Sequence, residues 1–271
     1  MTTIAICAPG KAITREAAQN VEDIAAARDD VTLRFHPQCF AQDGHFAGDD
    51  AIRLAAFLDC ANDPASDAVW FAAGGYGSNR IAAEAVAGLD AVGARKAYLG
   101  YSDTGYLLAE LYRAAVGVPV HGPMVSDIGR EDGAAAIERA LDWLVSAEPT
   151  EQADIPTVAF NLTTLAMLCG TGLMPDLTGH VVMVEEVGEY LYAVDRLFFH
   201  IAHHLRGVAG LKLGRISQVP ENDRPFGATA EEIAHYWCEK AGIAYLGRAD
   251  IGHDADNCVV PFGLAHTASG A

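Results

Sequence analysis

The chain has 271 residues, of which 51% are hydrophobic, and this is enough to bury a sizeable core in one large or two ordinary domains. It carries 36 acidic and 18 basic residues, a formal net charge of -18, and no run of Lys or Arg. Such a surface repels phosphate backbones and anionic lipid, so we expect neither nucleic acid nor membrane as a partner.

The amino-acid sequence also shows no signal-peptide pattern, no membrane-spanning segment and no CxxC motif. The start MTTIAICAPGK lacks a basic flank followed by a long apolar core, and no stretch reaches the roughly 18 apolar residues of a spanning helix. The six cysteines form no CxxC pair. We therefore expect a cytoplasmic protein with reduced, mostly buried thiols rather than disulfides or a zinc site.

In the first half of the chain, short apolar runs alternate with helical periods. The pattern predicts a parallel sheet flanked by helices. Predicted strands cover residues 3–9, 31–37, 68–75 and 96–103, and predicted helices cover 15–29, 49–62, 78–89, 105–116 and 134–147. The acidic, proline-bearing stretch 146–157 has no periodicity and is the candidate linker.

In the second half of the chain, the pattern predicts fewer strands and helices than in the first. Predicted strands cover residues 181–187 and 211–219, and predicted helices cover 189–206 and 228–242. Thr229 is a plausible N-cap of the last helix, with Glu232 three residues later. The coarse prediction is two α/β domains joined near residue 150.

Ser102 lies in YLGYSD, at a predicted strand-to-helix turn. A nucleophile elbow projects its hydroxyl from such a turn, and the next backbone N–H, here that of Asp103, faces a developing oxyanion. The motif is not a full G-x-S-x-G because position 104 is Thr. Taken alone, Ser102 is more often a helix N-cap, so both interpretations stay open.

The stretch GGYG, residues 74–77, follows another predicted strand. It fits neither G-x-G-x-x-G nor the P-loop pattern, but adjacent glycines let the backbone approach a ligand closely. Gly75 is a candidate second oxyanion donor, and a tight turn without a ligand is the alternative. The first predicted strand is followed by a single glycine, which argues against a dinucleotide cofactor.

A serine nucleophile needs a base, and the base needs an orienting carboxylate. Candidate acids stand at the end of a predicted strand, and a candidate base, His253, lies in the loop DIGHDADN; the acids are Glu185, Glu186 and Glu189. A helix-start charge and a solvated loop histidine are the ordinary alternatives. A metal site at His200, His203 and His204, or near His36 and His45, is disfavoured because HExxH is absent, so we expect no metal.

Six stretches, in order, resemble the LD-carboxypeptidases of bacterial murein recycling and the related microcin immunity peptidases. They span nearly the whole chain: IAICAPG (4–10), FAAGGYGSNRI (71–81), YLGYSDTGYL (98–107), VHGPM (120–124), 160–198 and IGHDADNCVVPFG (251–263). The sequence departs from the family in APGK, where members commonly show Ala-Pro-Ser, and in the little room between residues 219 and 251.

The resemblance implies a Ser-Glu-His triad at Ser102, Glu185 and His253, with Glu186 as the rival acid. Strand alternation points the two glutamates oppositely, so only one can face His253. The resemblance also implies an oxyanion hole formed by the backbone N–H groups of Gly75 and Asp103. Arg80, one turn after GGYG, is the candidate residue that binds the terminal carboxylate of the substrate, and Gly74 is a second candidate substrate-binding residue. The alternative for Arg80 is a structural ion pair.

The implied fold is a Rossmann-like or flavodoxin-like parallel-sheet domain over residues 1–147, a linker over 148–155, and a swivelling β-rich α/β domain over 156–271. The implied activity is a serine peptidase, without a cofactor, that removes the terminal D-alanine of a murein tetrapeptide across an L,D bond. The alternatives are cleavage of peptide–nucleotide conjugates, as in the immunity relatives, and a non-catalytic protein that binds a small peptide. Family members are typically homodimers.

Overall fold

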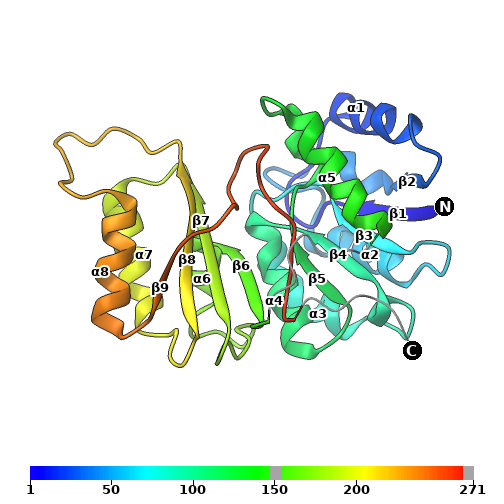
Figure 1. Ribbon diagram of the computed structural model, residues 1–271. Helices are drawn as coiled ribbons and strands as arrows, with labels where there is room; N and C mark the ends of the chain where they lie inside the picture. Colours follow the sequence, from blue (N-terminus) through cyan, green and yellow to red (C-terminus); the bar gives the residue numbers. More distant parts are fainter. Residues whose placement is uncertain (147–153, 265–271) are drawn as a thin grey trace.

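Two separate β-sheets, each flanked by helices, organise the chain in the computed structural model (Figure 1), which describes residues 1–146 and 154–264. The predicted linker, 148–155, lies almost entirely outside the described residues. Among the described helices, none is long and apolar enough to cross a membrane.

The first sheet has the strand order β10-β5-β4-β3-β1-β2. Strands β1 to β5 are mutually parallel, and β10 runs antiparallel to β5. The order β2-β1-β3-β4-β5 is that of flavodoxin-like folds, one of the two alternatives that the resemblance implied. The strands are β1 (Thr2–Cys7), β2 (Val31–Phe35), β3 (Ala68–Phe71), β4 (Ala97–Gly100), β5 (Val118–His121) and β10 (Val260–Pro261).

Helices cover both faces of this sheet, and each face has its own core. Along β3, Trp70 packs in the core with α1 and α5, whereas Phe71 packs in the opposite core, to which α2, α3 and α4 contribute. Consecutive residues of a buried strand enter different cores, so β3 is apolar throughout. The helices are α1 (Arg15–Ala26), α2 (Asp50–Asn62), α3 (Ala82–Ala87), α4 (Gly105–Ala114) and α5 (Gly133–Ser146).

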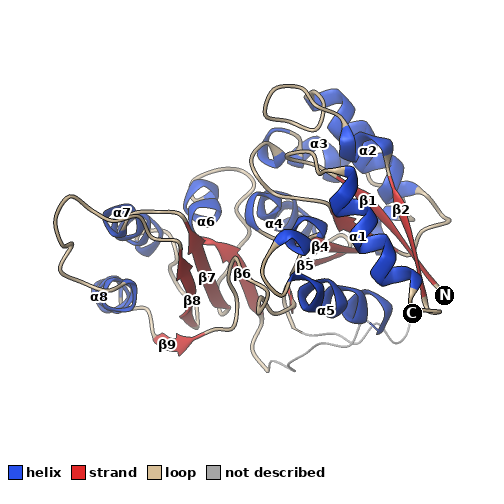
Figure 2. Cartoon of the chain, turned by 90° about the horizontal axis from the view of Figure 1, so that it is seen from above, coloured by secondary structure: helices blue, strands red, loops and turns tan. Residues whose placement is uncertain are grey.

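The second sheet is entirely parallel, in the order β6-β7-β8-β9. Its helices α6, α7 and α8 pack in a row beside it (Figure 2). The predicted capping box forms at α8, where the Thr229 N–H donates to Glu232 at 2.7 Å. The elements are β6 (Thr157–Asn161), α6 (Leu162–Leu168), β7 (Val181–Val187), α7 (Leu191–Ala202), β8 (Gly210–Ser217), α8 (Ala230–Ala241) and β9 (Tyr245–Arg248).

After β9 the chain returns to the first sheet (Figure 1). Residues 249–259 lead into β10, which pairs with β5, and Gly263 then exchanges two backbone hydrogen bonds with Thr157 of β6, at 2.8 and 2.9 Å. One apolar core continues across this junction, from Phe71 and Leu108 to Phe160 and Val184. The last segment therefore joins the two sheets and carries His253 between them.

Candidate active site

Ser102 lies at a sharp turn between β4 and α4. Its φ of 59° is in the left-handed region, which is rare for a residue other than glycine and is found at functional turns. The turn is crowded: a Cβ on Gly100 would stand 2.6 Å from the Thr104 hydroxyl oxygen. Helix α4 begins at Gly105 with Thr104 as its N-cap, so Ser102 does not cap this helix.

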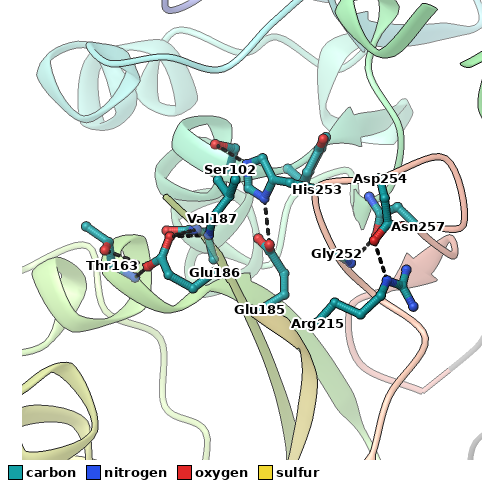
Figure 3. Close-up of polar contacts among 12 residues, drawn as sticks. Ser102, Thr163, Glu185, Glu186, Val187, Arg215, Gly252, His253, Asp254 and Asn257 are labelled. Carbon is teal, nitrogen blue, oxygen red and sulfur yellow. Dashed lines mark hydrogen bonds and ion pairs between the residues drawn. The ribbon is translucent and has the colours of Figure 1, made fainter. Parts of the chain in front are cut away.

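The His253 side chain lies beside Ser102, and the Glu185 side chain lies on the other side of the imidazole (Figure 3). The Nε2 atom of His253 lies 3.2 Å from the Oγ atom of Ser102, and the Nδ1 atom of His253 lies 2.6 Å from Oε2 of Glu185. Ser102 follows β4, and Glu185 stands near the end of β7. His253 lies in residues 249–259, which return from β9 to the first sheet and are called the returning segment below. The arrangement of hydroxyl, imidazole and carboxylate has the geometry of a nucleophile, base and orienting acid.

The two adjacent glutamates of β7 point in different directions. Glu186 accepts hydrogen bonds from the Asn161 side chain at 2.7 Å, and from the backbone N–H and hydroxyl of Thr163 at 2.8 and 2.6 Å. These bonds fix the start of α6. Glu185 is fully buried and reaches His253 instead, so the geometry agrees with the choice of Glu185 over Glu186.

Burial sets the electrostatics of this acid. Desolvation raises the pKa of Glu185 above the ordinary value, and the hydrogen bond from His253 opposes that rise. Gly214 of β8 provides the room, because a Cβ there would lie 2.9 Å from the Glu185 Cβ. A buried carboxylate with a single imidazole partner fixes the tautomer of that ring, so that Nδ1 carries a proton and Nε2 faces the serine.

The loop that carries His253 is tied to the first sheet. Arg130 donates to the backbone carbonyl of His253 at 2.5 Å and pairs with the buried Asp127 at 2.6 Å, while the Tyr101 hydroxyl also donates to Asp127, at 2.9 Å. The Tyr101 and His253 rings are 4.8 Å apart. A second tie joins Arg139 to the carbonyl of Ala255 at 2.6 Å. The imidazole is thus positioned by backbone anchors as well as by Glu185.

Gly74, which precedes the candidate oxyanion donor Gly75, lies beside Ser102 and the Asp103 nitrogen. A Cβ on Gly74 would stand 3.1 Å from Ser102 Oγ and 3.4 Å from the Asp103 nitrogen, and Gly75 has a φ of 89°. The Asp103 carboxylate accepts from the backbone N–H groups of Gly77 and Ser78 at 3.2 and 2.9 Å. These bonds lock the GGYG turn against the serine turn, and only glycine at position 74 leaves space beside the hydroxyl.

Arg80 does not lie among these groups. Its guanidinium pairs with Asp50, with nitrogen–oxygen distances of 2.7 to 2.9 Å, and stands over the ring of Phe46. This is the ion pair that the sequence analysis left as an alternative. Within residues 1–146 and 154–264, no three His, Cys, Asp or Glu side chains are placed to hold a metal ion.

Comparison with known families gives a match for both halves of the chain. Residues 4–122 match the LD-carboxypeptidase N-terminal domain, and residues 156–267 match the LD-carboxypeptidase C-terminal domain. The chain belongs to the LD-carboxypeptidase family. The resemblance found in the sequence is thereby confirmed.

Relatives of this LD-carboxypeptidase family member are also named as carboxypeptidases. A Synechocystis protein named as a carboxypeptidase is 30% identical over 234 residues, 81% of this chain and 75% of the relative. A Bacillus subtilis protein named as a murein peptide carboxypeptidase is 28% identical over 242 residues, 82% of this chain and 75% of the relative. The family and these names support a peptidase of the carboxypeptidase type.

Two solved structures share its fold. Muramoyltetrapeptide carboxypeptidase from Oxalobacter formigenes superposes with a TM-score of 0.81 at 23% identity, over 97% of this chain and 93% of that one. The microcin C7 self-immunity protein MccF, in complex with glutamyl sulfamoyl guanosine, superposes with a TM-score of 0.79 at 18% identity, over 97% and 91%. The mixed α/β architecture, with one predominantly parallel and one entirely parallel sheet, is therefore shared with solved structures of this kind.

Sequence reasoning missed the supporting residues of this LD-carboxypeptidase site. Asn161, Asp127 and Arg130 carry no motif of their own, and their partners lie 25, 3 and 123 positions away in the chain. Asn161 gave the clearest available signal, since it ends a strand-like apolar run just before a helical period. Arg130 gave none, because its acceptor is a backbone carbonyl.

Proposed function

We propose that this protein is a serine carboxypeptidase that hydrolyses an L,D peptide bond and releases the terminal D-alanine of murein tetrapeptide. The observation that carries the proposal is the convergence of Ser102, His253 and Glu185 from three separate segments, at 3.2 and 2.6 Å. A protein that only binds peptides needs no such relay. Family membership and the names of the relatives point to the same reaction.

The mechanism follows from the order of the three groups. His253 Nε2 takes the proton of Ser102 as Oγ attacks the carbonyl carbon of the penultimate residue, and Glu185 stabilises the resulting imidazolium. The backbone N–H groups of Gly75 and Asp103 bind the tetrahedral oxyanion. His253 then protonates the leaving amine of D-alanine, and a water molecule, activated by the same imidazole, releases the acyl group from Ser102.

The left-handed backbone at Ser102 serves this chemistry. It lifts the side chain out of the strand direction and leaves the following N–H, on Asp103, beside the space that Gly74 keeps open. A single donor in such a hole is worth roughly 3 to 4 kcal/mol in the transition state. A side chain at position 74 would occupy the space needed by the substrate oxygen.

The biological setting is part of the same proposal. We infer a cytoplasmic homodimer that acts on peptides recovered from peptidoglycan and uses neither metal nor cofactor. The strongly acidic surface, with 36 acidic against 18 basic residues, is unsuited to nucleic acid or anionic lipid as a partner.

The test compares substrates with the purified protein. The tetrapeptide L-Ala-D-Glu-meso-diaminopimelate-D-Ala should release D-alanine, and its diastereomer ending in L-alanine should release no L-alanine. Release from neither peptide, together with cleavage of a peptidyl sulfamoyl nucleotide, would replace the proposal with an immunity-type peptidase, the kind of activity for which MccF is the structural precedent. Cleavage of no substrate would favour a binding protein.

A further inference from the structure

The proposed reaction requires a group that reads the terminal carboxylate of the substrate. In a peptide the carboxylate carbon lies about 4 Å from the scissile carbonyl carbon, because only a nitrogen and one Cα separate them. The reader must therefore stand within one residue's length of the Ser102 hydroxyl. A cation with free N–H groups suits this task, since hydrogen bonds between charged groups are the strong ones.

Four arginines near the site are already committed to other partners. Arg80 pairs with Asp50, and Arg53 is fully buried and pairs with the same carboxylate. Arg130 pairs with Asp127 and holds the carbonyl of His253, and Arg215 pairs with Asp254 at 2.5 Å. Recruiting Arg53 or Arg130 would take the donor away from a backbone carbonyl, which costs free energy at a buried site. Recruiting Arg80 or Arg215 would break an existing ion pair with Asp50 or Asp254.

Lys11 is different in both position and partners. It follows β1, and its stem lies against the GGYG turn: a Cβ on Gly75 would stand 3.0 to 3.1 Å from the Cβ, Cγ and Cδ atoms of Lys11. The side chain is exposed, and no described carboxylate lies within ion-pairing distance of its ammonium. It is a cation available to a ligand, beside a glycine that we assign to the oxyanion hole.

The backbone around Lys11 is fixed rather than loose. The Lys11 N–H donates to the Gly74 carbonyl at 3.0 Å, and Gly10 approaches that carbonyl so closely that a Cβ on it would lie 2.3 Å from the oxygen. Arg53 bonds both the Pro9 carbonyl and, at 2.8 Å, the Gly77 carbonyl, so it ties the loop after β1 to the loop after β3. These loops meet where the strand order reverses, the usual binding crevice of such sheets.

We propose that Lys11 binds the terminal carboxylate of the substrate and makes the enzyme selective for peptides with a free carboxyl end. This inference rests on the proposed function. It assigns to Lys11 the role that the sequence analysis gave to Arg80. The aliphatic stem of Lys11 lies on Gly75, and a Cβ on the preceding Gly74 would stand 3.1 Å from the Ser102 hydroxyl oxygen.

The experiment measures kcat/KM for two substrates, the tetrapeptide and the same peptide with a C-terminal carboxamide, by chromatography of released D-alanine or D-alaninamide. Wild type should prefer the acid. Lys11→Met keeps the stem and removes the charge, and it should lower kcat/KM for the acid roughly ten- to hundredfold while leaving the amide unchanged. Lys11→Arg should restore most of the preference, and Lys240→Met, at the far end of α8, should not alter it.

Each other outcome overturns the inference. An unchanged acid-to-amide ratio in Lys11→Met, or an equal loss on both substrates, shows that Lys11 does not read the carboxylate, although the proposed function then stands because wild type is active. If wild type releases nothing from either peptide, the proposed function fails, and the inference that rests on it fails as well.

Discussion

At the scale of single residues, the site depends on which of two adjacent glutamates faces the imidazole. Glu185 lies 2.6 Å from the Nδ1 atom of His253, whereas Glu186 holds the start of α6 through Asn161 and Thr163. The alternation of side chains along a strand predicted this division, but not its direction. The direction depends on the position of His253, 68 residues further along the chain.

This division predicts opposite effects for two isosteric substitutions. Glu185→Gln should lower kcat at least roughly a hundredfold, because the amide no longer stabilises the imidazolium. Glu186→Gln should leave kcat within a few-fold but should lower the free energy of unfolding by roughly 1 to 3 kcal/mol, since a buried acceptor of several hydrogen bonds is lost. Steady-state kinetics and urea unfolding of both variants test this. A larger loss of kcat in Glu186→Gln would mean that the acid is misassigned.

At the scale of elements, the sequence pattern predicted most of the helices and the strands that alternate with them, and it missed four strands. The alternation of apolar runs and helical periods predicted β1 to β4 and their helices, because each period covers several residues. The strands β5, β6, β9 and β10 were not predicted from periodicity. Strand β10 has two residues, and its pairing with β5 depends on a contact across more than a hundred positions, which no local pattern encodes.

The returning segment has little secondary structure, and its role is to hold His253 in place. Arg130 fixes the carbonyl of His253, so Arg130→Met should lower kcat about tenfold with little change in KM, because the imidazole loses its alignment but keeps its carboxylate partner. Arg28→Met is the matched control: Arg28 pairs with Asp30 and Asp142, away from the site. Kinetics of both variants, with thermal unfolding as a check on folding, distinguish the two. An unchanged kcat in Arg130→Met would show that Arg130 does not position His253.

At the scale of the whole molecule, the two sheets share one core and both contribute to the candidate active site. Ser102 comes from the first sheet, Glu185 from the second, and His253 from the segment that joins them. Family membership could be predicted from six ordered stretches of sequence, whereas the contacts that assemble the site, such as those of Arg130, could not. They link side chains to backbone groups that are adjacent only after both sheets have formed.

A buried histidine at this junction makes the stability of the molecule depend on pH. His121, at the end of β5, bonds Asn257 of the returning segment at 3.0 Å, and desolvation lowers the pKa of His121 from 6.5 to about 4. Between these values the unfolded chain binds a proton that the folded chain does not, so this contribution to stability is lost as pH falls through that window.

From pH 7 to pH 5, His121 should account for a loss of about 2 kcal/mol in the free energy of unfolding. His121→Gln keeps an N–H donor for Asn257 but cannot titrate, so the pH dependence of its unfolding should be weaker than that of wild type by about this amount. Urea unfolding at the two pH values measures the difference. Identical pH dependence in the two proteins would show that His121 does not stay neutral in the folded state.

The measurement that tests the central claim most directly is the rate of D-alanine release from murein tetrapeptide by wild type and by Ser102→Ala, each shown by thermal unfolding to be folded. We expect wild type to release D-alanine and the variant to be at least about a thousandfold slower, since it lacks the nucleophile while the oxyanion donors remain. Release by Ser102→Ala at a rate near that of wild type would contradict the proposed triad.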